Sequence, residues 1–281
     1  MITSIIFSKD RPLQLDLTLK SISKNFKDTN DIVVLEKYSE AYQESLNNVK
    51  IEHPNIKFIT QSNSIYADIC SISINSNNKY ICFFTDDNIV YRQVSQSVSY
   101  DNLFSAPQVV CLSLRLGKNI HKRFHHGREM SDELNHYQEI GDYVFVPKTM
   151  YIYGSYWSYS HSVDGHVFRK SEIIDMFSQI EYLSKKFQFK QTPNEVETQM
   201  QRFWPISGNF MVCTQHSTVV NSPNNRVSKT HTENFSGEHF MYESEFLLGK
   251  YMNGKRIDMD LLDLSNIVCP HQEIDILNGL I

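Results

Sequence analysis

The sequence predicts an α/β fold in which helices flank a mostly parallel, Rossmann-like central sheet. Short apolar runs of strand length alternate along the chain with segments whose apolar residues recur at helical spacing. Each helix returns the chain to the same end of the sheet, so this alternation makes neighbouring strands parallel. No linker, repeat or low-complexity tract interrupts the pattern, and residues 1–281 are therefore expected to form one domain.

The first half of the chain contains four predicted strands, at residues 2–7, 32–35, 57–60 and 80–84. Between them, helical spacing of apolar residues predicts three helices, over about residues 12–26, 40–47 and 67–74. Pro12 suits the first turn of the first helix, because proline lacks an N–H that this position would leave unpaired.

The second half is predicted to add strands at residues 108–114, 143–146, 210–213 and 217–220. Helices are expected over residues 171–183, from Asn194 as an N-cap, and over residues 238–248 up to Gly249. Residues 117–142 are polar and lack hydrophobic periodicity, so we interpret them as an excursion or lid. The loop 221–229 is interpreted as mobile.

Two adjacent carboxylates, Asp86 and Asp87, follow the apolar run Tyr80–Phe84 almost directly. Such a pair beside a core strand repels itself and loses hydration unless something offsets both costs. The usual offset is a divalent metal, and oxygen ligands suit Mg²⁺ or Mn²⁺. A metal held by one or two protein carboxylates generally shares its shell with substrate phosphates. The alternative interpretation is an Asp–Asn turn between two strands.

Polar residues also follow the earlier predicted strands, at Ser8 to Arg11, at Tyr38 and at Gln61. Ligands of open parallel sheets bind outside the carboxyl ends of the strands. These residues and the acidic pair all fall at such ends, which favours a metal–nucleotide site over a simple turn.

The totals argue against several classes of protein. The net charge of −5 does not fit a nucleic-acid binder that relies on a basic face. No run of about 18 apolar residues is present, so no membrane-spanning helix is expected. Residues 1–7 lack the basic lead of a signal peptide. The five scattered cysteines have no zinc spacing and are interpreted as reduced core residues of a cytoplasmic protein.

The first 95 residues resemble the nucleotide-sugar glycosyltransferases of the GT-A fold, and especially their inverting, family 2-like group. The resemblance rests on a short polar loop with Arg11-Pro12 opening a helix, on two further βα units, and on the stretch Thr85-Asp86-Asp87-Asn88. That stretch is similar to forms of the DxD motif in this group. The rest of the chain resembles the family only loosely.

This resemblance implies the transfer of a sugar from a nucleoside-diphosphate sugar to a hydroxyl of a glycan or lipid-linked acceptor. It also implies that the transfer inverts the anomeric configuration. A UDP-sugar is the favoured donor, and Mn²⁺ or Mg²⁺ is the implied cofactor. Peripheral membrane contact is compatible with a lipid-linked acceptor. Residues 1–105 would then be the nucleotide-sugar half, and residues 106–281 the acceptor half.

The resemblance also implies roles for single residues on the donor side. Phe7, Ser8 and Arg11 would line the pocket for the base and phosphates. Tyr38, Gln61 and Arg115 are further candidates to bind the nucleotide sugar, although Arg115 also fits a solvated basic loop. For Arg11, the alternative is a surface cation beside Asp10.

The implied metal ligand is Asp87, and Asp86 would bond the ribose or the metal shell. Asn88 is a weaker candidate ligand, because the third position of the motif is Asn rather than Asp. His271, near the end of the chain, is nominated as the histidine that returns to the metal or the diphosphate.

An acidic residue at the start of a later helix is the general base in the resembling family. Glu197 is the favoured candidate, followed by Glu195 and Asp164; the alternative is that the helix dipole alone favours these acids. On the acceptor side, Trp157 belongs to an aromatic cluster that suits sugar rings. Near it, Gly165 permits a tight turn that would bring His166 to the edge of the site.

Two rival functions remain open from the residues. A sugar-phosphate nucleotidyltransferase would share the sheet and the metal but needs a Gly-rich loop after the first strand, and residues 8–12 contain no glycine. A non-catalytic glycan- or nucleotide-binding module would keep the aromatic cluster but has no use for the pair Asp86 and Asp87.

Overall fold

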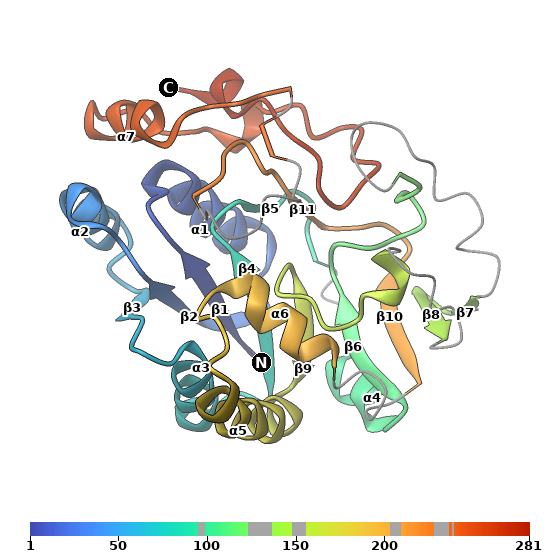
Figure 1. Cartoon of the computed structure of the whole chain (residues 1–281). Coiled ribbons are helices and arrows are strands. Elements are labelled where there is room, and N and C mark those ends of the chain that lie inside the picture. The colour runs from blue at the N-terminus through green and yellow to red at the C-terminus, as the bar shows by residue number, and fades with distance from the viewer. Residues whose placement is uncertain (95–98, 123–136, 148–155, 203–208, 228–235, 238) are drawn as a thin grey trace.

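The computed structural model describes residues 1–94, 99–122, 137–147, 156–202, 209–227, 236–237 and 239–281 (Figure 1). It confirms the α/β class, with a large central sheet flanked by helices. The strands of this sheet are β1 (Ile2–Ser8), β2 (Thr29–Glu36), β3 (Lys57–Thr60), β4 (Tyr80–Thr85), β6 (Val109–Ser113), β7 (Gln138–Ile140), β8 (Tyr143–Pro147), β9 (His166–Arg169) and β10 (Phe210–Thr214).

Within the described residues the sheet has nine strands in the order β3-β2-β1-β4-β9-β6-β10-β8-β7. The four strands predicted in the first half of the chain are all present and pair in parallel. Strand β9 lies antiparallel between β4 and β6, and β8 is antiparallel to β10 and β7. The sheet is therefore mostly parallel in strand direction, with β8 and β9 reversed.

Helices cover both faces of the sheet (Figure 1). They are α1 (Pro12–Asn25), α2 (Gln43–Glu52), α3 (Ile65–Asn75), α4 (Tyr100–Ser105), α5 (Lys170–Phe187), α6 (Pro193–Gln201) and α7 (Ser244–Met252). From β1 to β3 the chain moves outward in one direction, so right-handed crossovers place α1 and α2 on one face. The chain then returns to β4, which places α3 on the opposite face, where it packs against α5.

Several element boundaries differ from the sequence predictions. The N-cap of α6 is Thr192, whose hydroxyl accepts a bond from the Glu195 N–H, and not Asn194, because Pro193 takes the first helical position. Helix α7 begins at Ser244 rather than near residue 238, and it runs through Gly249 instead of ending there. Strand β7 and helix α4 were not predicted. All three residues of β7 are exposed, which hides its hydrophobic pattern.

A second, two-stranded sheet pairs β5 (Asn88–Val90) with β11 (Val219–Asn221) in antiparallel fashion. Only Asp86 and Asp87 separate β4 from β5, so the acidic pair does occupy a turn between two strands. The turn nevertheless lies at the carboxyl end of a central strand of the parallel sheet. The two interpretations of this stretch are therefore compatible in geometry.

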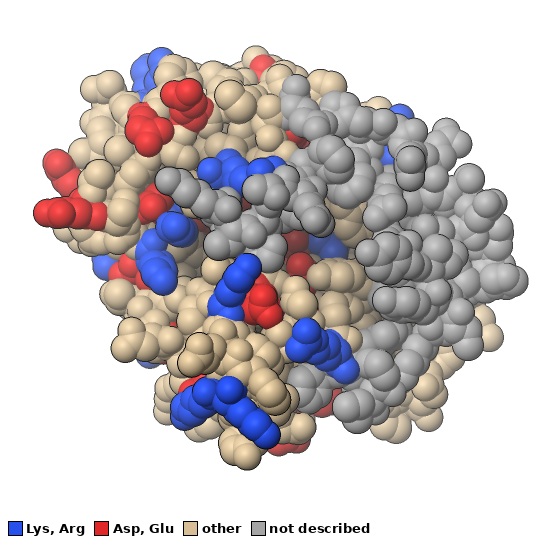
Figure 2. All heavy atoms as spheres, viewed as in Figure 1, with Lys and Arg blue, Asp and Glu red and all other residues tan. Residues whose placement is uncertain are grey.

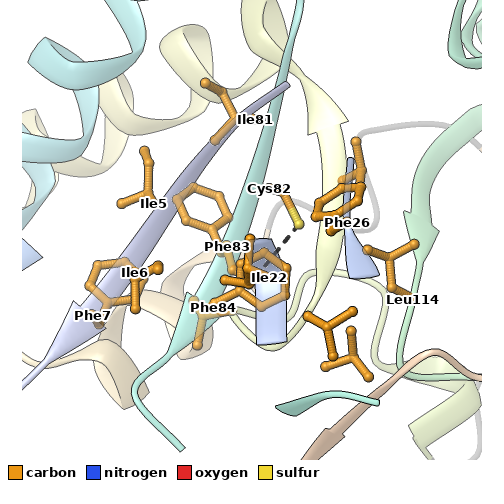
Figure 3. Close-up of a cluster of buried hydrophobic side chains, with 14 of the residues drawn as sticks. Ile5, Ile6, Phe7, Ile22, Phe26, Ile81, Cys82, Phe83, Phe84 and Leu114 are labelled. Atoms are coloured by element: carbon orange, nitrogen blue, oxygen red, sulfur yellow. Dashed lines mark hydrogen bonds between the residues drawn. The ribbon is translucent and has the colours of Figure 1, made fainter. Parts of the chain in front are cut away.

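Aromatic side chains of the core pack against β4, which pairs with β1. Phe83 and Phe84 alternate across β4, so that Phe83 stacks on Phe7 and Phe84 meets Phe26 of the α1 C-cap edge to face (Figure 3). In this register Phe7 of β1 lies opposite Thr85 of β4, and the Phe7 carbonyl accepts a hydrogen bond from the Asp86 N–H over 3.0 Å. The loop after β1 consequently lies beside the acidic turn.

Among the helices that the structure describes, none has the length and apolar character needed to cross a membrane.

Candidate active site

Asp86 is held by the loop that follows β1. Its Oδ2 accepts hydrogen bonds from the Ser8 hydroxyl at 3.0 Å and from the Lys9 backbone N–H at 2.8 Å. The Ser8 hydroxyl also lies 3.0 Å from the Tyr38 hydroxyl, which ties the end of β2 to the same point. Burial raises the pKa of Asp86 to about 6, against the opposing charge of Arg11. This carboxyl therefore depends on its cationic neighbour to stay ionised.

Asp87 is held by Asn221, the last residue of β11. Its Oδ1 accepts a hydrogen bond from the Asn221 amide at 2.7 Å and lies 2.7 Å from the Thr85 hydroxyl. Its Oδ2 accepts a bond from Arg11 Nη1 at 2.8 Å, and the same nitrogen lies 3.0 Å from Asp86 Oδ1. One guanidinium nitrogen thus bridges both carboxylates.

Asp164, in the loop before β9, forms a third carboxylate of the same network. Its Oδ1 lies 2.8 Å from the Thr85 hydroxyl and 3.3 Å from the Asn88 amide nitrogen. Thr85 has a single hydroxyl proton, so it donates to Asp87 or to Asp164 but not to both at once. Asp164 Oδ2 accepts a bond from Arg115 Nη1 at 2.9 Å, and Arg115 is only 1% exposed. Arg115 therefore neutralises Asp164 inside the protein.

His271 forms hydrogen bonds with Arg115 and with Asn221. Arg115 Nη1 lies 3.2 Å from His271 Nε2, and a guanidinium can only donate, so Nε2 accepts and the ring proton sits on Nδ1. Nδ1 then donates to the Asn221 side-chain oxygen at 3.1 Å. Burial and the Arg115 charge lower the pKa of His271 to about 4, so the ring is neutral near pH 7.

A metal would need a different arrangement of His271. Its Nε2 lone pair faces Arg115, and its assignment as a metal ligand stays a prediction that requires Arg115 to release it. Within the part of the chain that the structure describes, no three His, Cys, Asp or Glu side chains are grouped as a ready metal site.

Glu197 of α6 lies against the loop that carries Asp164. Its Oε1 accepts hydrogen bonds from the Ser162 hydroxyl at 2.6 Å and from the Val163 N–H at 3.2 Å, in the loop that carries Asp164. Loss of water around the carboxyl, together with the charge of Asp164, raises the pKa of Glu197 to about 7. A carboxyl that titrates near neutrality can exchange a proton with a substrate hydroxyl.

Glu195 points away from this network, although it is only two positions from Glu197. Its Oε1 accepts a bond from the Gln199 amide at 2.6 Å on the same helix. Residues two apart on an α-helix project in nearly opposite directions, so only one of the pair can face the Asp164 loop.

Four other candidates occupy positions with limited access to the acidic turn. The Phe7 ring belongs to the core, and its backbone carbonyl is its contact with the site. Gln61 donates to the Gln191 carbonyl at 3.2 Å, near the start of α6. Trp157 and His166 are 2% and 0% exposed, so an acceptor would need another conformation to touch them, and both assignments stay predictions.

Sequence reasoning missed Asn221 and Asn225 as site residues. From the sequence, the loop 221–229 is interpreted only as mobile. The three asparagines within residues 221–225 are nevertheless a usable signal, because each amide both donates and accepts. The face of the molecule shown in Figure 2 carries both basic and acidic side chains at its surface.

Comparisons with known proteins leave the family open. A scan against models of protein families found no match, and a search of curated proteins found none. Solved structures with a similar course of the chain include Staphylococcus aureus TarS in complex with UDP, at 12% identity and a TM-score of 0.44, over 79% of this chain and 61% of that one.

Two further structures are similar at lower scores. One is the mannosyltransferase from Pyrobaculum calidifontis with GDP-Man and Mn²⁺, at 12% identity and a TM-score of 0.30, over 42% of this chain and 36% of that one. The other is bifunctional IspDF from Campylobacter jejuni, at 10% identity and a TM-score of 0.36, over 76% and 49%. The chain spans less than two thirds of the length of each of these three. Because every score is below 0.5, none carries an argument about function.

Proposed function

We propose that this chain is a glycosyltransferase that uses a nucleoside-diphosphate sugar and a divalent cation, and that it transfers the sugar to an acceptor hydroxyl with inversion. The observation that carries the proposal is the pair Asp86 and Asp87 at the carboxyl end of β4, with both carboxylates directed at one cationic nitrogen of Arg11. One carboxylate would be enough to neutralise the charge of one guanidinium. Two carboxylates match the charge of a divalent ion.

The residues present fit such an ion. Arg11 Nη1 acts as a stand-in cation, because it lies within 3.0 Å of an oxygen from each carboxylate. Asp86 and Asp87 would hold Mg²⁺ or Mn²⁺, which favour oxygen ligands and keep room for substrate phosphates. Asn88 fits less well, because its amide oxygen already accepts from the Thr85 N–H and its amide nitrogen faces Asp164. When bound, the ion would neutralise charge on the departing nucleoside diphosphate.

Glu197 supplies the proton acceptor in this proposal. An acceptor hydroxyl oxygen forms the new bond to the anomeric carbon while the bond from that carbon to the diphosphate oxygen breaks. The hydroxyl proton passes to Glu197, whose pKa of about 7 suits a base that works near neutral pH. Attack from the face opposite the leaving diphosphate gives inversion in a single displacement.

We propose for Arg115 a role other than binding the nucleotide sugar. Its guanidinium pairs with Asp164 at 2.9 Å and is 1% exposed, which leaves little of it for a phosphate. We propose that it offsets the charge of Asp164, so that Glu197 faces less negative charge. Arg11 is then the cation best placed for the donor phosphates.

Calorimetric titration with UDP, GDP and dTDP, each with and without Mn²⁺, tests the proposal. A UDP-sugar donor predicts Mn²⁺-dependent binding of UDP that Asp87→Ala abolishes. Asp175→Ala, which removes an exposed carboxylate from α5, serves as the matched control and should bind as the wild type does.

Two results would count against the proposal. If the folded wild type bound none of the three nucleotides, the acidic pair would be no more than a turn. If it bound a glycan equally well in wild type and Asp87→Ala, a non-catalytic binding module would replace the transferase.

A further inference from the structure

Arg11 makes four polar contacts, two with the acidic turn and two with Asn225. Nη1 bridges Asp86 Oδ1 and Asp87 Oδ2 at 3.0 and 2.8 Å. Nε donates to the Asn225 side-chain oxygen at 2.7 Å, and Nη2 donates to the Asn225 backbone carbonyl at 2.5 Å. The guanidinium is therefore gripped on one side by carboxylates and on the other by a neutral residue.

Asn225 belongs to the segment that also holds Asp87. It is 6% exposed, and its amide lies 3.4 Å from the Gln14 amide on α1. Three residues earlier, the Ser222 N–H donates to the Asp87 carbonyl at 2.8 Å. The segment 222–225 therefore holds both the acidic turn, through Ser222, and Arg11, through Asn225.

The oxygens that face Arg11 are those a divalent ion would take. Asp86 Oδ2 is already bonded to Ser8 and Lys9, and Asp87 Oδ1 is bonded to Asn221. This leaves Asp86 Oδ1 and Asp87 Oδ2 directed at the guanidinium. Two cations cannot share this point, because at a few ångströms in a buried site their repulsion is large.

We propose that Arg11 is a displaceable counter-cation, which leaves the acidic pair when a divalent ion binds and turns to the donor diphosphate. This inference rests on the proposed function, since it concerns the same cation site. A free guanidinium suits a diphosphate, because its N–H groups match phosphate oxygens in pairs. When the metal binds alone, it displaces the Arg11 guanidinium, which then has no new partner. When the nucleotide binds as well, its diphosphate becomes the new partner of Arg11.

Two consequences follow for binding. Mn²⁺ should bind weakly in the absence of nucleotide, and bound nucleotide should raise the affinity for Mn²⁺. The coupling is reciprocal by thermodynamic linkage, so Mn²⁺ should strengthen nucleotide binding by the same factor.

Electron paramagnetic resonance of free Mn²⁺ tests the inference in the absence of nucleotide. Arg11→Gln should bind Mn²⁺ more tightly than the wild type, by about 5- to 150-fold, the usual range of coupling between sites. Lys9→Gln is the matched control, because it removes a neighbouring cation whose Nζ contacts the Val227 carbonyl and neither carboxylate. Mn²⁺ affinity in Lys9→Gln should stay close to that of the wild type.

Asn225→Ala provides a second variant that keeps Arg11 and its charge. It removes the side-chain oxygen that anchors Nε, so Mn²⁺ should bind more tightly than to the wild type, though less so than to Arg11→Gln. This variant decides the question if Arg11→Gln fails to fold. Equal Mn²⁺ affinity in the wild type and in the folded variants would overturn the inference.

A parallel titration with UDP present separates this inference from the proposed function. If UDP strengthens Mn²⁺ binding to the wild type but neither variant binds Mn²⁺ more tightly without it, the inference fails and the function stands. If no variant binds Mn²⁺ with or without nucleotide, both fail. If Arg11→Gln binds Mn²⁺ tightly and UDP adds little, the displacement mechanism is supported.

Discussion

The Asn221 side-chain amide donates a hydrogen bond to Asp87 Oδ1 over 2.7 Å. The other end of the same amide accepts from the His271 ring at 3.1 Å, which fixes the orientation of the amide. Asn221 therefore aims the Asp87 carboxylate, and His271 holds Asn221 in place for that task. In this arrangement His271 acts on the acidic pair through a neighbour.

Asn221→Ala should weaken Mn²⁺-dependent nucleotide binding. A hydrogen bond to a charged group contributes roughly 1.5–3 kcal/mol, so the affinity should fall by about tenfold or more. Calorimetry on the folded variant measures this loss. Asn253→Ala removes an exposed amide after α7 and should bind as the wild type does. Unchanged nucleotide affinity in Asn221→Ala would show that Asp87 does not need the hydrogen bond from Asn221.

The parallel βα units could be predicted because their signals are local. Apolar periodicity placed β3 at residues 57–60 to the residue, and Pro12 marked the start of α1. Polar residues at consecutive strand ends also gave the location of the acidic turn, because parallel strands end at one edge of the sheet.

The contacts that complete the site could not be predicted, because they join distant parts of the chain. Asn225 is 214 positions from Arg11, and its grip on the guanidinium depends on how β11 pairs with β5. Likewise, the choice between Glu195 and Glu197 depends on the rotation of α6 about its axis. That rotation is set by tertiary packing, which the acidic pattern does not encode.

Thr192→Ala tests the observed cap of α6. The Thr192 hydroxyl accepts a hydrogen bond from the Glu195 N–H, so its loss should lower the free energy of unfolding by about 1 kcal/mol. Asn194→Ala, the cap that sequence reasoning favoured, should cost much less because Asn194 already lies inside the helix. Urea denaturation followed by circular dichroism compares the two. A larger loss in Asn194→Ala would reverse the assignment.

The proposed role of Glu197 as general base predicts how the transfer rate depends on pH. A general base must be deprotonated, so kcat/KM should be low at acidic pH, rise with pH, and reach half its limit near pH 7, the raised pKa of this carboxyl. Glu197→Gln should lose turnover by roughly 100-fold or more, the usual contribution of general base catalysis, while nucleotide affinity changes little. Stopped assays of sugar transfer from pH 5 to 9 provide the profile. A rate that falls with rising pH through 7 would assign Glu197 the opposite role.

Among substitutions in the site, Arg115→Met is expected to lower the free energy of unfolding the most. The guanidinium is 1% exposed and pairs with Asp164 at 2.9 Å, so its removal leaves a buried carboxylate without its cation. Breaking one side of a buried ion pair typically costs about 3–5 kcal/mol of unfolding free energy. Adding Asp164→Asn replaces the unpaired carboxylate by a neutral amide of similar size. The double variant should therefore recover part of that loss. Urea denaturation of the wild type, both single variants and the double variant measures the coupling between the two residues. If the two losses simply added, Arg115 would stabilise the protein by packing against Tyr156 and not by neutralising Asp164.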